Sequence, residues 1–253
     1  MSHPLSGKVA IVTGGSRGIG AAITRRLARD GADVAFSYAS NTARAEEIAA
    51  AISANGVRAL PIQADQADPV AVAKFVRTVH AHFGRLNILV NSAGITVGGR
   101  IDDLSADVAA IQHMLSVNLH GVVATVRAVA PIMENGGRIV SIGSVVASHI
   151  AFSGFADYTA AKAAIAAYTR GWARDLGPRG ITVNVVQPGA IETESNPNSG
   201  DFAKILARMA ALGRYGQTEE VGMRSLSWLA RMPPSSPAPR STSMAGKLPK
   251  FKL

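Results

Sequence analysis

Short apolar runs alternate with longer helical segments along most of the chain. Six runs have the length and continuous apolar character of buried strands: KVAIVTG (8–14), ADVAFSYA (32–39), VRALPIQAD (57–65), LNILVNSAG (86–94), GRIVSIGSV (137–145) and ITVNVVQPG (181–189). Helical segments are predicted over 18–30, 42–55, 69–83, two stretches within 105–133, and 156–176. Asp68 directly precedes Pro69, which predicts an N-cap for the third helix.

Strands that alternate with helices form right-handed βαβ units, and such units build a parallel sheet covered on both faces. We therefore expect an α/β protein with a single doubly wound, Rossmann-type sheet. No compositional boundary precedes the C-terminal segment. The predicted catalytic domain spans residues 1–222, and residues 223–253 form a separate basic, Pro/Ser-rich tail.

The tail explains most of the net charge of +9. It carries six basic residues and no acidic one, which leaves the other 222 residues with only about +3. Because a charge of that size is ordinary for a globular protein, we expect no nucleic-acid partner.

Composition excludes several other classes. No run of eighteen apolar residues is present, so no membrane span is expected, and the N-terminus lacks the apolar core of a signal peptide. The chain has no cysteine, which excludes disulfides. His80 and His82 point to different sides of a helix, so no metal site is expected. Together these features predict a soluble cytoplasmic protein.

The segment TGGSRGIG joins the first predicted strand to its helix. Its glycines, Gly14, Gly18 and Gly20, have the spacing G-x-x-x-G-x-G. Glycine lets backbone turn sharply or lie against a phosphate, and the following helix N-terminus offers free N–H groups to a pyrophosphate. The position of this loop predicts a dinucleotide site, although a tight turn without a ligand is the alternative.

A tyrosine and a lysine lie one turn apart in DYTAAKAAI (157–165), and so share a helix face. Lowering a tyrosine pKa from about 10 to about 7 requires roughly 4 kcal/mol. A charge about 4 Å away at an effective dielectric of about 20 supplies roughly that much. We therefore expect Lys162 to lower the pKa of Tyr158. The alternative is a packed tyrosine beside a surface lysine, but Ser144, at the end of the fifth strand, favours an active site.

These motifs, taken in order, resemble those of the classical short-chain dehydrogenases/reductases, over about residues 5–221. The glycine loop resembles T-G-x-x-x-G-x-G, NSAG (91–94) resembles N-N-A-G with Ser92 as a departure, and QPGAIET (187–193) resembles P-G-x-x-x-T. The resemblance implies a catalytic tetrad at Asn118, Ser144, Tyr158 and Lys162. Within the family the chain looks most like the 3-oxoacyl-[acyl-carrier-protein] reductases.

The resemblance also implies the cofactor contacts. No acidic residue ends the second strand, and Arg17 lies in the glycine loop, so we expect NADP, with NAD less favoured. The cofactor-binding set is Gly14, Ser16, Arg17, Gly18, Ile19, Gly20, Tyr38, Ser40, Asn41, Asp65, Gln66, Asn91, Ala93, Gly94, Tyr158, Lys162, Pro188, Gly189, Ile191 and Thr193.

The expected function is hydride transfer between the nicotinamide cofactor and a small-molecule carbonyl or secondary alcohol, such as a 3-oxoacyl thioester. His149, Ile150, Phe152 and Phe155 are expected beside the pocket, and the polar segment 192–201 is expected to start a mobile lid. Arg100 and Arg127 are candidates for meeting an acyl carrier, although solvated charge also explains them. We expect a homodimer or homotetramer.

The tail also lacks the family's closing strand. Read one base out of frame, Met232 to Ala245 can spell AAEFTGAALDIDGG, which resembles that missing ending, and this predicts a frameshift between about residues 222 and 231. The alternative is a genuine disordered basic tail. A defective ending would leave the last strand missing, and the alternative function is then a catalytically impaired NADP-binding protein.

Overall fold

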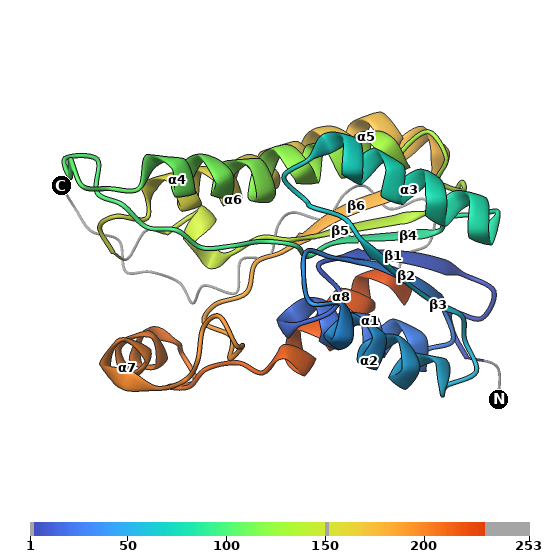
Figure 1. The fold of residues 1–253 in the computed structure, drawn as a ribbon, viewed down its shortest axis with the longest axis horizontal. Helices are drawn as coiled ribbons and strands as arrows, with labels where there is room; N and C mark the ends of the chain where they lie inside the picture. Colours follow the sequence, from blue (N-terminus) through green and yellow to red (C-terminus); the bar gives the residue numbers. More distant parts are fainter. Residues whose placement is uncertain (1–2, 150–151, 231–253) are drawn as a thin grey trace.

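Six parallel strands form one sheet in the order β3-β2-β1-β4-β5-β6 (Figure 1). The computed structural model describes residues 3–149 and 152–230. The strands are β1 (Val9–Thr13), β2 (Asp33–Tyr38), β3 (Ala59–Gln63), β4 (Ile88–Asn91), β5 (Arg138–Ile142) and β6 (Thr182–Val186). Each lies within one of the six apolar runs, so the strand predictions are confirmed.

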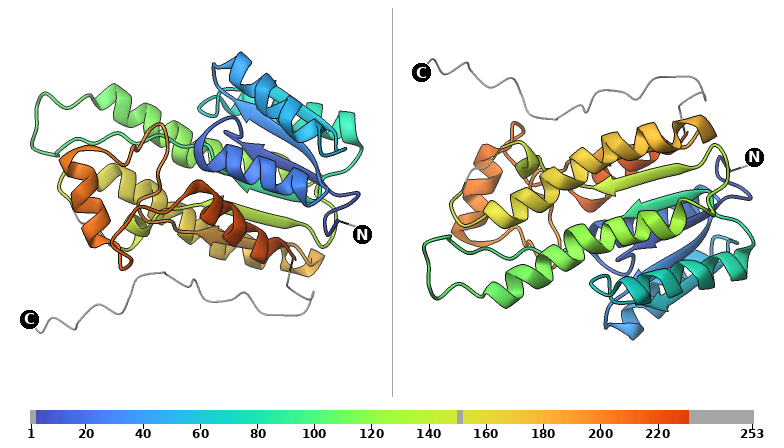
Figure 2. Two further views of the ribbon diagram at one scale, coloured as in Figure 1. Left: turned by 90° about the horizontal axis from the view of Figure 1, so that it is seen from below. Right: turned by 90° about the horizontal axis from the view of Figure 1, so that it is seen from above.

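Helices cover both faces of this sheet, as Figures 1 and 2 show. One layer contains α1 (Gly18–Arg29), α2 (Thr42–Ser53) and α8 (Thr218–Ala230). The other contains α3 (Pro69–Phe83), α4 (Val108–Leu115), α5 (Gly121–Val129) and α6 (Ala156–Leu176). This arrangement confirms the doubly wound, Rossmann-type fold.

The alternating side chains of β1 show how the two layers are held. Ala10 and Val12 pack in the cluster that includes residues of α1 and α2, whereas Val9 and Ile11 pack in the cluster that includes residues of α3 and α5. All four side chains are at most 1% exposed. Because successive residues of a strand face opposite sides, one apolar run supplies both cores.

The helix boundaries agree with the local sequence signals in most places. The Asp68 side chain accepts a hydrogen bond from the Val70 backbone N–H at 2.8 Å, which confirms the predicted cap of α3. Residues 108–129, by contrast, form one continuous helical rod, because a π-helical turn, η1 (Ser116–His120), joins α4 to α5. The sequence predicted two helical stretches there.

A short helix, α7 (Gly200–Met209), was not predicted. It follows the polar, turn-rich segment 192–199, whose residues indicate a loop and mask the start of a helix. Figure 1 shows α7 apart from the two helical layers, at the end of the molecule where α4 begins. Among the described residues it has no extensive packing against another helix or a strand.

The carboxyl ends of the central strands lie in register. Thr13 of β1 is opposite Asn91 of β4, and Asn91 is opposite Ser141 of β5. The strand order reverses between β1 and β4, and ligands of open parallel sheets bind at such a switch point. The fold therefore brings the glycine loop, the NSAG loop and the end of β5 to one crevice.

The predicted boundary between the domain and the tail, after residue 222, falls inside α8, which continues to Ala230, so residues 223–230 belong to this helix. The rest of the predicted tail, residues 231–253, lies outside the described part of the chain. The missing last strand and the frameshift therefore stay predictions, and the DNA sequence tests the frameshift directly. No described helix is long and apolar enough to span a bilayer.

Candidate active site

The glycine loop turns from β1 into α1 with backbone that only glycine tolerates. Gly14 has a φ of +65°, and a Cβ there would lie 2.9 Å from the Ala93 Cα. A Cβ on Gly20 would lie 2.1 Å from the Gly14 carbonyl oxygen. Ser37 fixes the loop, since its Oγ accepts from the Gly14 N–H at 3.1 Å and its carbonyl accepts from the Gly15 N–H at 3.0 Å.

The N-terminus of α1 opens directly into this loop. Its N-cap residue, Arg17, has extended backbone and makes no side-chain capping bond. The first-turn N–H groups of a helix have no intrahelical acceptor, and together with the helix dipole they attract a phosphate. This helix end is therefore suited to bind an anion.

Thr13 holds the NSAG loop against the end of β1. Its hydroxyl oxygen accepts from the Ser92 N–H at 3.0 Å and from the Ala93 N–H at 3.1 Å. Asn91 is buried, and its Nδ2 donates to the Ser141 Oγ at 3.2 Å. These bonds join three neighbouring strands at their carboxyl ends and make the floor of the crevice rigid.

Asn118 lies in the middle of the π-helical turn and acts through the backbone of Ile95. Its Oδ1 accepts from the Ile95 N–H at 2.9 Å, and its Nδ2 donates to the Ile95 carbonyl at 2.7 Å. Asn118 is only 1% exposed. The extra residue of a π turn redirects the helix locally, and such turns are frequent at functional sites. The turn thus aligns the Asn118 amide with both the backbone N–H and the backbone carbonyl of Ile95.

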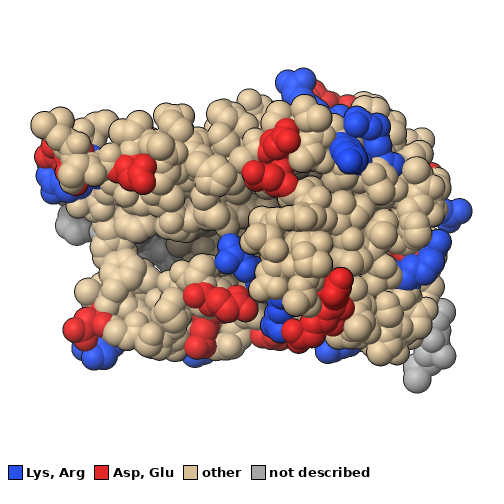
Figure 3. Space-filling model, viewed as in Figure 1, with Lys and Arg blue, Asp and Glu red and all other residues tan. Residues whose placement is uncertain are grey.

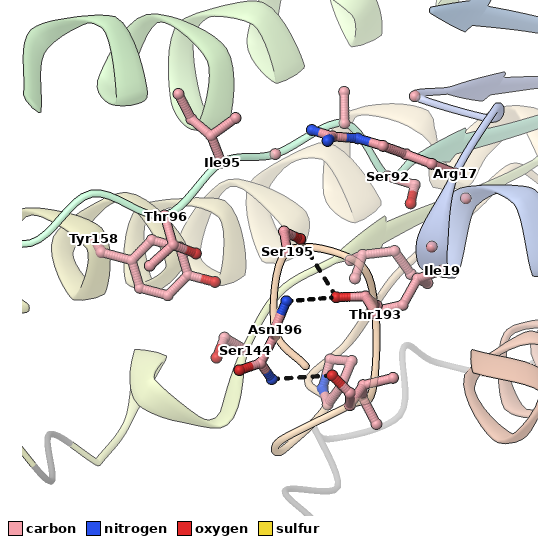
Figure 4. Close-up of a pocket in the computed structure, with 18 of the residues that line it drawn as sticks. Arg17, Ile19, Ser92, Ile95, Thr96, Ser144, Tyr158, Thr193, Ser195 and Asn196 are labelled. Carbon is pink, nitrogen blue, oxygen red and sulfur yellow. Dashed lines mark hydrogen bonds between the residues drawn. The ribbon is translucent and has the colours of Figure 1, made fainter. Parts of the chain in front are cut away.

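Ser144, Tyr158 and Lys162 come together at the end of β5, as Figure 4 shows for the first two. Ser144 caps a short 3₁₀ helix, η2 (Val145–Ala147). Tyr158 and Lys162 share a face of α6, and the Lys162 Nζ lies 5.7 Å from the centre of the Tyr158 ring. The same Nζ donates to the Ile142 carbonyl at 3.0 Å.

The electrostatics of this group differ from the expectation. Burial raises the pKa of Tyr158, while hydrogen bonding with Thr96 and Ser144 lowers it. Burial lowers the pKa of Lys162 to about 8. Desolvation penalises the charged form of each group and is the largest cause of both shifts. The pKa of Tyr158 thus lies above its ordinary value, whereas we expected it from the sequence to lie below.

A cavity of about 770 Å³ runs from the glycine loop to α7. Most predicted site residues line it: Gly14, Ser16, Arg17, Gly18, Ile19, Gly20, Tyr38, Asp65, Gln66, Ala93, Gly94, Ser144, Tyr158, Lys162, Pro188, Gly189, Ile191 and Thr193.

Four residues of the predicted catalytic and cofactor-binding sets are not among the residues that line this cavity: Ser40, Asn41, Asn91 and Asn118. His149, expected beside the pocket, does not line it either, and Ile150 lies outside the described residues. Asn41 caps α2, and its side chain accepts from the Arg44 N–H at 2.9 Å. The amides of Asn91 and Asn118 bond to neighbouring chain segments instead. Among the described residues, no cluster of histidine and carboxylate side chains could hold a metal ion.

Several lining residues were missed by the sequence analysis. Thr96 follows the NSAG motif by two residues, and that proximity could have identified it. Ile95 directly follows the same motif, and the others come from helices and turns that carry no motif: His113, Val117, Phe202, Leu206 and Tyr215. Ser195 and Asn196 also line the cavity, and they belong to the segment 192–201 that was expected near the pocket. Figure 4 shows the hydroxyl of Thr96 beside that of Tyr158.

Residues 8–203 match the family model described as short chain dehydrogenase. The cyclic-di-GMP-binding biofilm dispersal mediator protein of Escherichia coli K12 is 44% identical over 89% of this chain and 90% of its own length. A 3-oxoacyl-[acyl-carrier-protein] reductase of Synechocystis is 39% identical over 86% of this chain and 87% of its own. A short chain dehydrogenase of Burkholderia cenocepacia J2315, solved in complex with NADP, is 47% identical, covers 90% of this chain and 92% of its own, and superposes with a TM-score of 0.87. The chain therefore belongs to the short-chain dehydrogenase/reductase family of oxidoreductases.

Proposed function

We propose that this protein is an NADP-dependent enzyme that reduces a carbonyl compound to a secondary alcohol, or catalyses the reverse oxidation. The observation that carries the proposal is the shared cavity. Tyr158, Ser144 and Lys162 line the same space as the glycine loop. A phenol, a hydroxyl and an ammonium thus stand next to a dinucleotide-sized channel.

The residues present fit a dinucleotide. A Cβ on Gly14 or Gly20 would meet backbone within 2.9 Å, so the loop stays narrow and leaves its amides open to a phosphate. The uncapped α1 N-terminus faces the same channel. Farther along the cavity, beside Tyr158, the Lys162 ammonium can donate a hydrogen bond to a ribose hydroxyl of the dinucleotide. A bound NADPH would supply the hydride.

The side chains then divide the remaining work. Tyr158 donates a proton to the substrate oxygen during reduction and accepts it during oxidation. Ser144 donates a hydrogen bond to that oxygen and stabilises the charge that develops on it. When Lys162 is protonated, its ammonium favours the phenolate form of Tyr158. Asn118 fixes the loop at Ile95 and so positions the wall opposite Tyr158.

The preference for NADP rests on Arg17 and on a relative. Arg17 is exposed and lines the cavity, and β2 ends at Tyr38 without an acidic residue. A carboxylate at that point would hydrogen-bond the ribose of NAD and repel a 2′-phosphate. The related Burkholderia protein was solved with NADP.

The named relatives support one substrate class and leave one alternative function. The Synechocystis relative is named as a 3-oxoacyl-[acyl-carrier-protein] reductase, which supports a 3-oxoacyl thioester. The alternative function is a catalytically impaired NADP-binding protein, which would follow from a defective C-terminus; the Escherichia coli relative is named for binding cyclic-di-GMP and not for a reaction.

The substitution Tyr158→Phe tests the proposal. It should lower kcat by roughly 10²–10⁴-fold, because the proton donor is lost. NADPH binding should stay within about twofold, since the ring is retained and its loss of one hydroxyl is small. NADPH oxidation with a ketone panel and a fluorescence titration measure the two effects. Full turnover in the variant would contradict the role of Tyr158, and NADPH binding without turnover in the unmodified protein would favour the alternative.

A further inference from the structure

Four aromatic rings form a continuous chain from the proposed proton donor to α7. The Tyr158 and Phe155 ring centres are 6.4 Å apart, and those of Phe155 and Phe152 are 6.5 Å apart. The Phe152 and Phe202 ring centres are 5.3 Å apart. All four residues line the cavity. Such tilted and edge-to-face rings readily accept a further ring at their edges or faces.

The other residues at this end of the cavity are mainly apolar. They include Ile95, Val117, Val145, Val146, Ala203 and Leu206. The lysine and arginine side chains among the described lining residues are Arg17, in the glycine loop, and Lys162, whose ammonium donates to the Ile142 carbonyl. The aromatic end therefore offers no cation of its own to a carboxylate or a phosphate.

Two segments border the aromatic end, residues 97–108 and the region of α7, residues 198–212. Together they carry four carboxylates and three cations, so their charges nearly balance. Asp102 pairs with Arg100 at 2.7 Å, and Asp201 pairs with Lys204 at 2.9 Å. Figure 3 shows acidic and basic side chains close together at this end of the molecule. The entrance therefore has no strong net charge that would attract a charged partner.

Phe202 is half-exposed although it lines the cavity, with 50% of its surface accessible. It lies on α7, which has little packing against other described helices or strands. A ring in that position gains burial when an apolar ligand covers it. We therefore expect the substrate, rather than the protein core, to bury the exposed part of the Phe202 ring.

We infer that the preferred substrate is a free, uncharged ketone bearing an aromatic or alicyclic ring, and that Phe202 determines this specificity. The ring packs along Phe152 and Phe202, while the carbonyl points to Tyr158 and Ser144. This inference rests on the proposed function and selects a ring-bearing ketone over an open-chain one.

The test compares three substrates of the full chain with NADPH: acetophenone, 2-butanone and acetoacetyl thioester on acyl carrier protein. Acetophenone should have the highest kcat/KM. In Phe202→Ala the ratio of kcat/KM for acetophenone over 2-butanone should fall roughly 10-fold, since one aromatic contact and its burial are lost. Met209→Ala is the matched control, because Met209 is also 50% exposed on α7 but is not among the lining residues.

An unchanged ratio in Phe202→Ala, or a higher kcat/KM for the carrier thioester than for acetophenone, would overturn the inference. A binding measurement separates this outcome from failure of the proposed function. Calorimetry of acetophenone with the NADPH-loaded Tyr158→Phe chain should give a Kd that rises roughly 10-fold when Phe202→Ala is added. That result without turnover in the unmodified protein would contradict the proposed function and support only the binding of a ring at Phe202. Ketone turnover without any ring preference would support the proposed function and overturn the inference.

Discussion

At the scale of single residues, Arg17 carries the cofactor preference. Its guanidinium is exposed at the N-cap of α1 and has no ion-pair partner among the residues that the structure describes. A guanidinium that binds a 2′-phosphate forms charge-assisted hydrogen bonds. Arg17→Ala should therefore raise the Kd of NADPH roughly 10-fold and leave that of NADH within about twofold. Arg29→Ala, at the other end of α1, removes the same charge as a control. Fluorescence titrations with equal losses for the two cofactors would contradict the assignment.

The burial of Lys162 makes the free energy of unfolding depend on pH, and it also sets the sign of that dependence. Its pKa is lowered from 10.5 to about 8 in the folded protein. Below about pH 8 both folded and unfolded chains carry the proton, and the burial cost of the ammonium is fully present. Between about pH 8 and 10.5 the unfolded chain binds more protons, so stability rises with pH.

Relative to Lys162→Met, the unmodified chain should thus gain stability over that window, by roughly 3 kcal/mol at most. Urea unfolding of both chains at several pH values measures the difference. If the difference in unfolding free energy between the two chains stays constant from pH 7 to 10, the Lys162 ammonium is not held in a desolvated site. Lys162 was identifiable from the sequence as a functional residue, but this depth of burial depends on chain segments remote from its own helix.

At the scale of elements, the π-helical turn η1 connects a helix to the loop after β4. Asn118→Ala removes both bonds to the Ile95 backbone and leaves two part-buried polar groups without these partners. The cost should be about 2–4 kcal/mol, which lowers the Tm by roughly 4–16 °C for a chain of this size. Ser116→Ala is the control, because its hydroxyl bonds only within the helix, to the Gln112 carbonyl. Calorimetry with equal Tm values for the two variants would refute the bridging role.

Sequence patterns predicted the elements well where the signal was local. Apolar runs identified all six strands, and Asp68 before Pro69 identified the start of α3. The π turn was missed because bonds to Ile95, 23 residues away along the chain, hold it rather than any helix signal of its own. The short α7 was missed because glycine, serine, proline and asparagine before it are the residues of loops. Asn41 was assigned to the cofactor, but capping α2 uses its side chain oxygen.

At the scale of the whole molecule, the sequence located the crevice because strand ends of a parallel sheet meet at one edge. Gly14, Asn91 and Ser144 each follow or end a strand, and their proximity was predictable from βα alternation alone. Phe152 and Phe155 were predicted beside the pocket and line it, but Phe202 was not predicted, since only the fold brings it to Phe152. The rise in the Tyr158 pKa by burial was not predicted either, because the degree of burial is a property of the assembled core.

The expected homodimer or homotetramer is also a property of the whole molecule. The helices within residues 105–133 and 156–176 are candidates for the contact, since the continuous rod of α4, η1 and α5 lies beside α6 in one outer layer (Figure 2). On α6, Tyr168 stacks on Trp172 with ring centres 5.0 Å apart, yet 43% of Tyr168 is exposed. A partner that covered this pair would bury aromatic surface.

Tyr168→Glu places a charge at that contact and should raise the dissociation constant of the oligomer at least about 10-fold. Ala50→Glu, an exposed position on α2 in the opposite layer, adds the same charge and should leave assembly unchanged. Sedimentation velocity across a range of protein concentrations measures both variants. If Tyr168→Glu sediments like the unmodified chain while that chain is oligomeric, the interface lies on another face, and if the unmodified chain is monomeric at every concentration, the expected oligomer does not form.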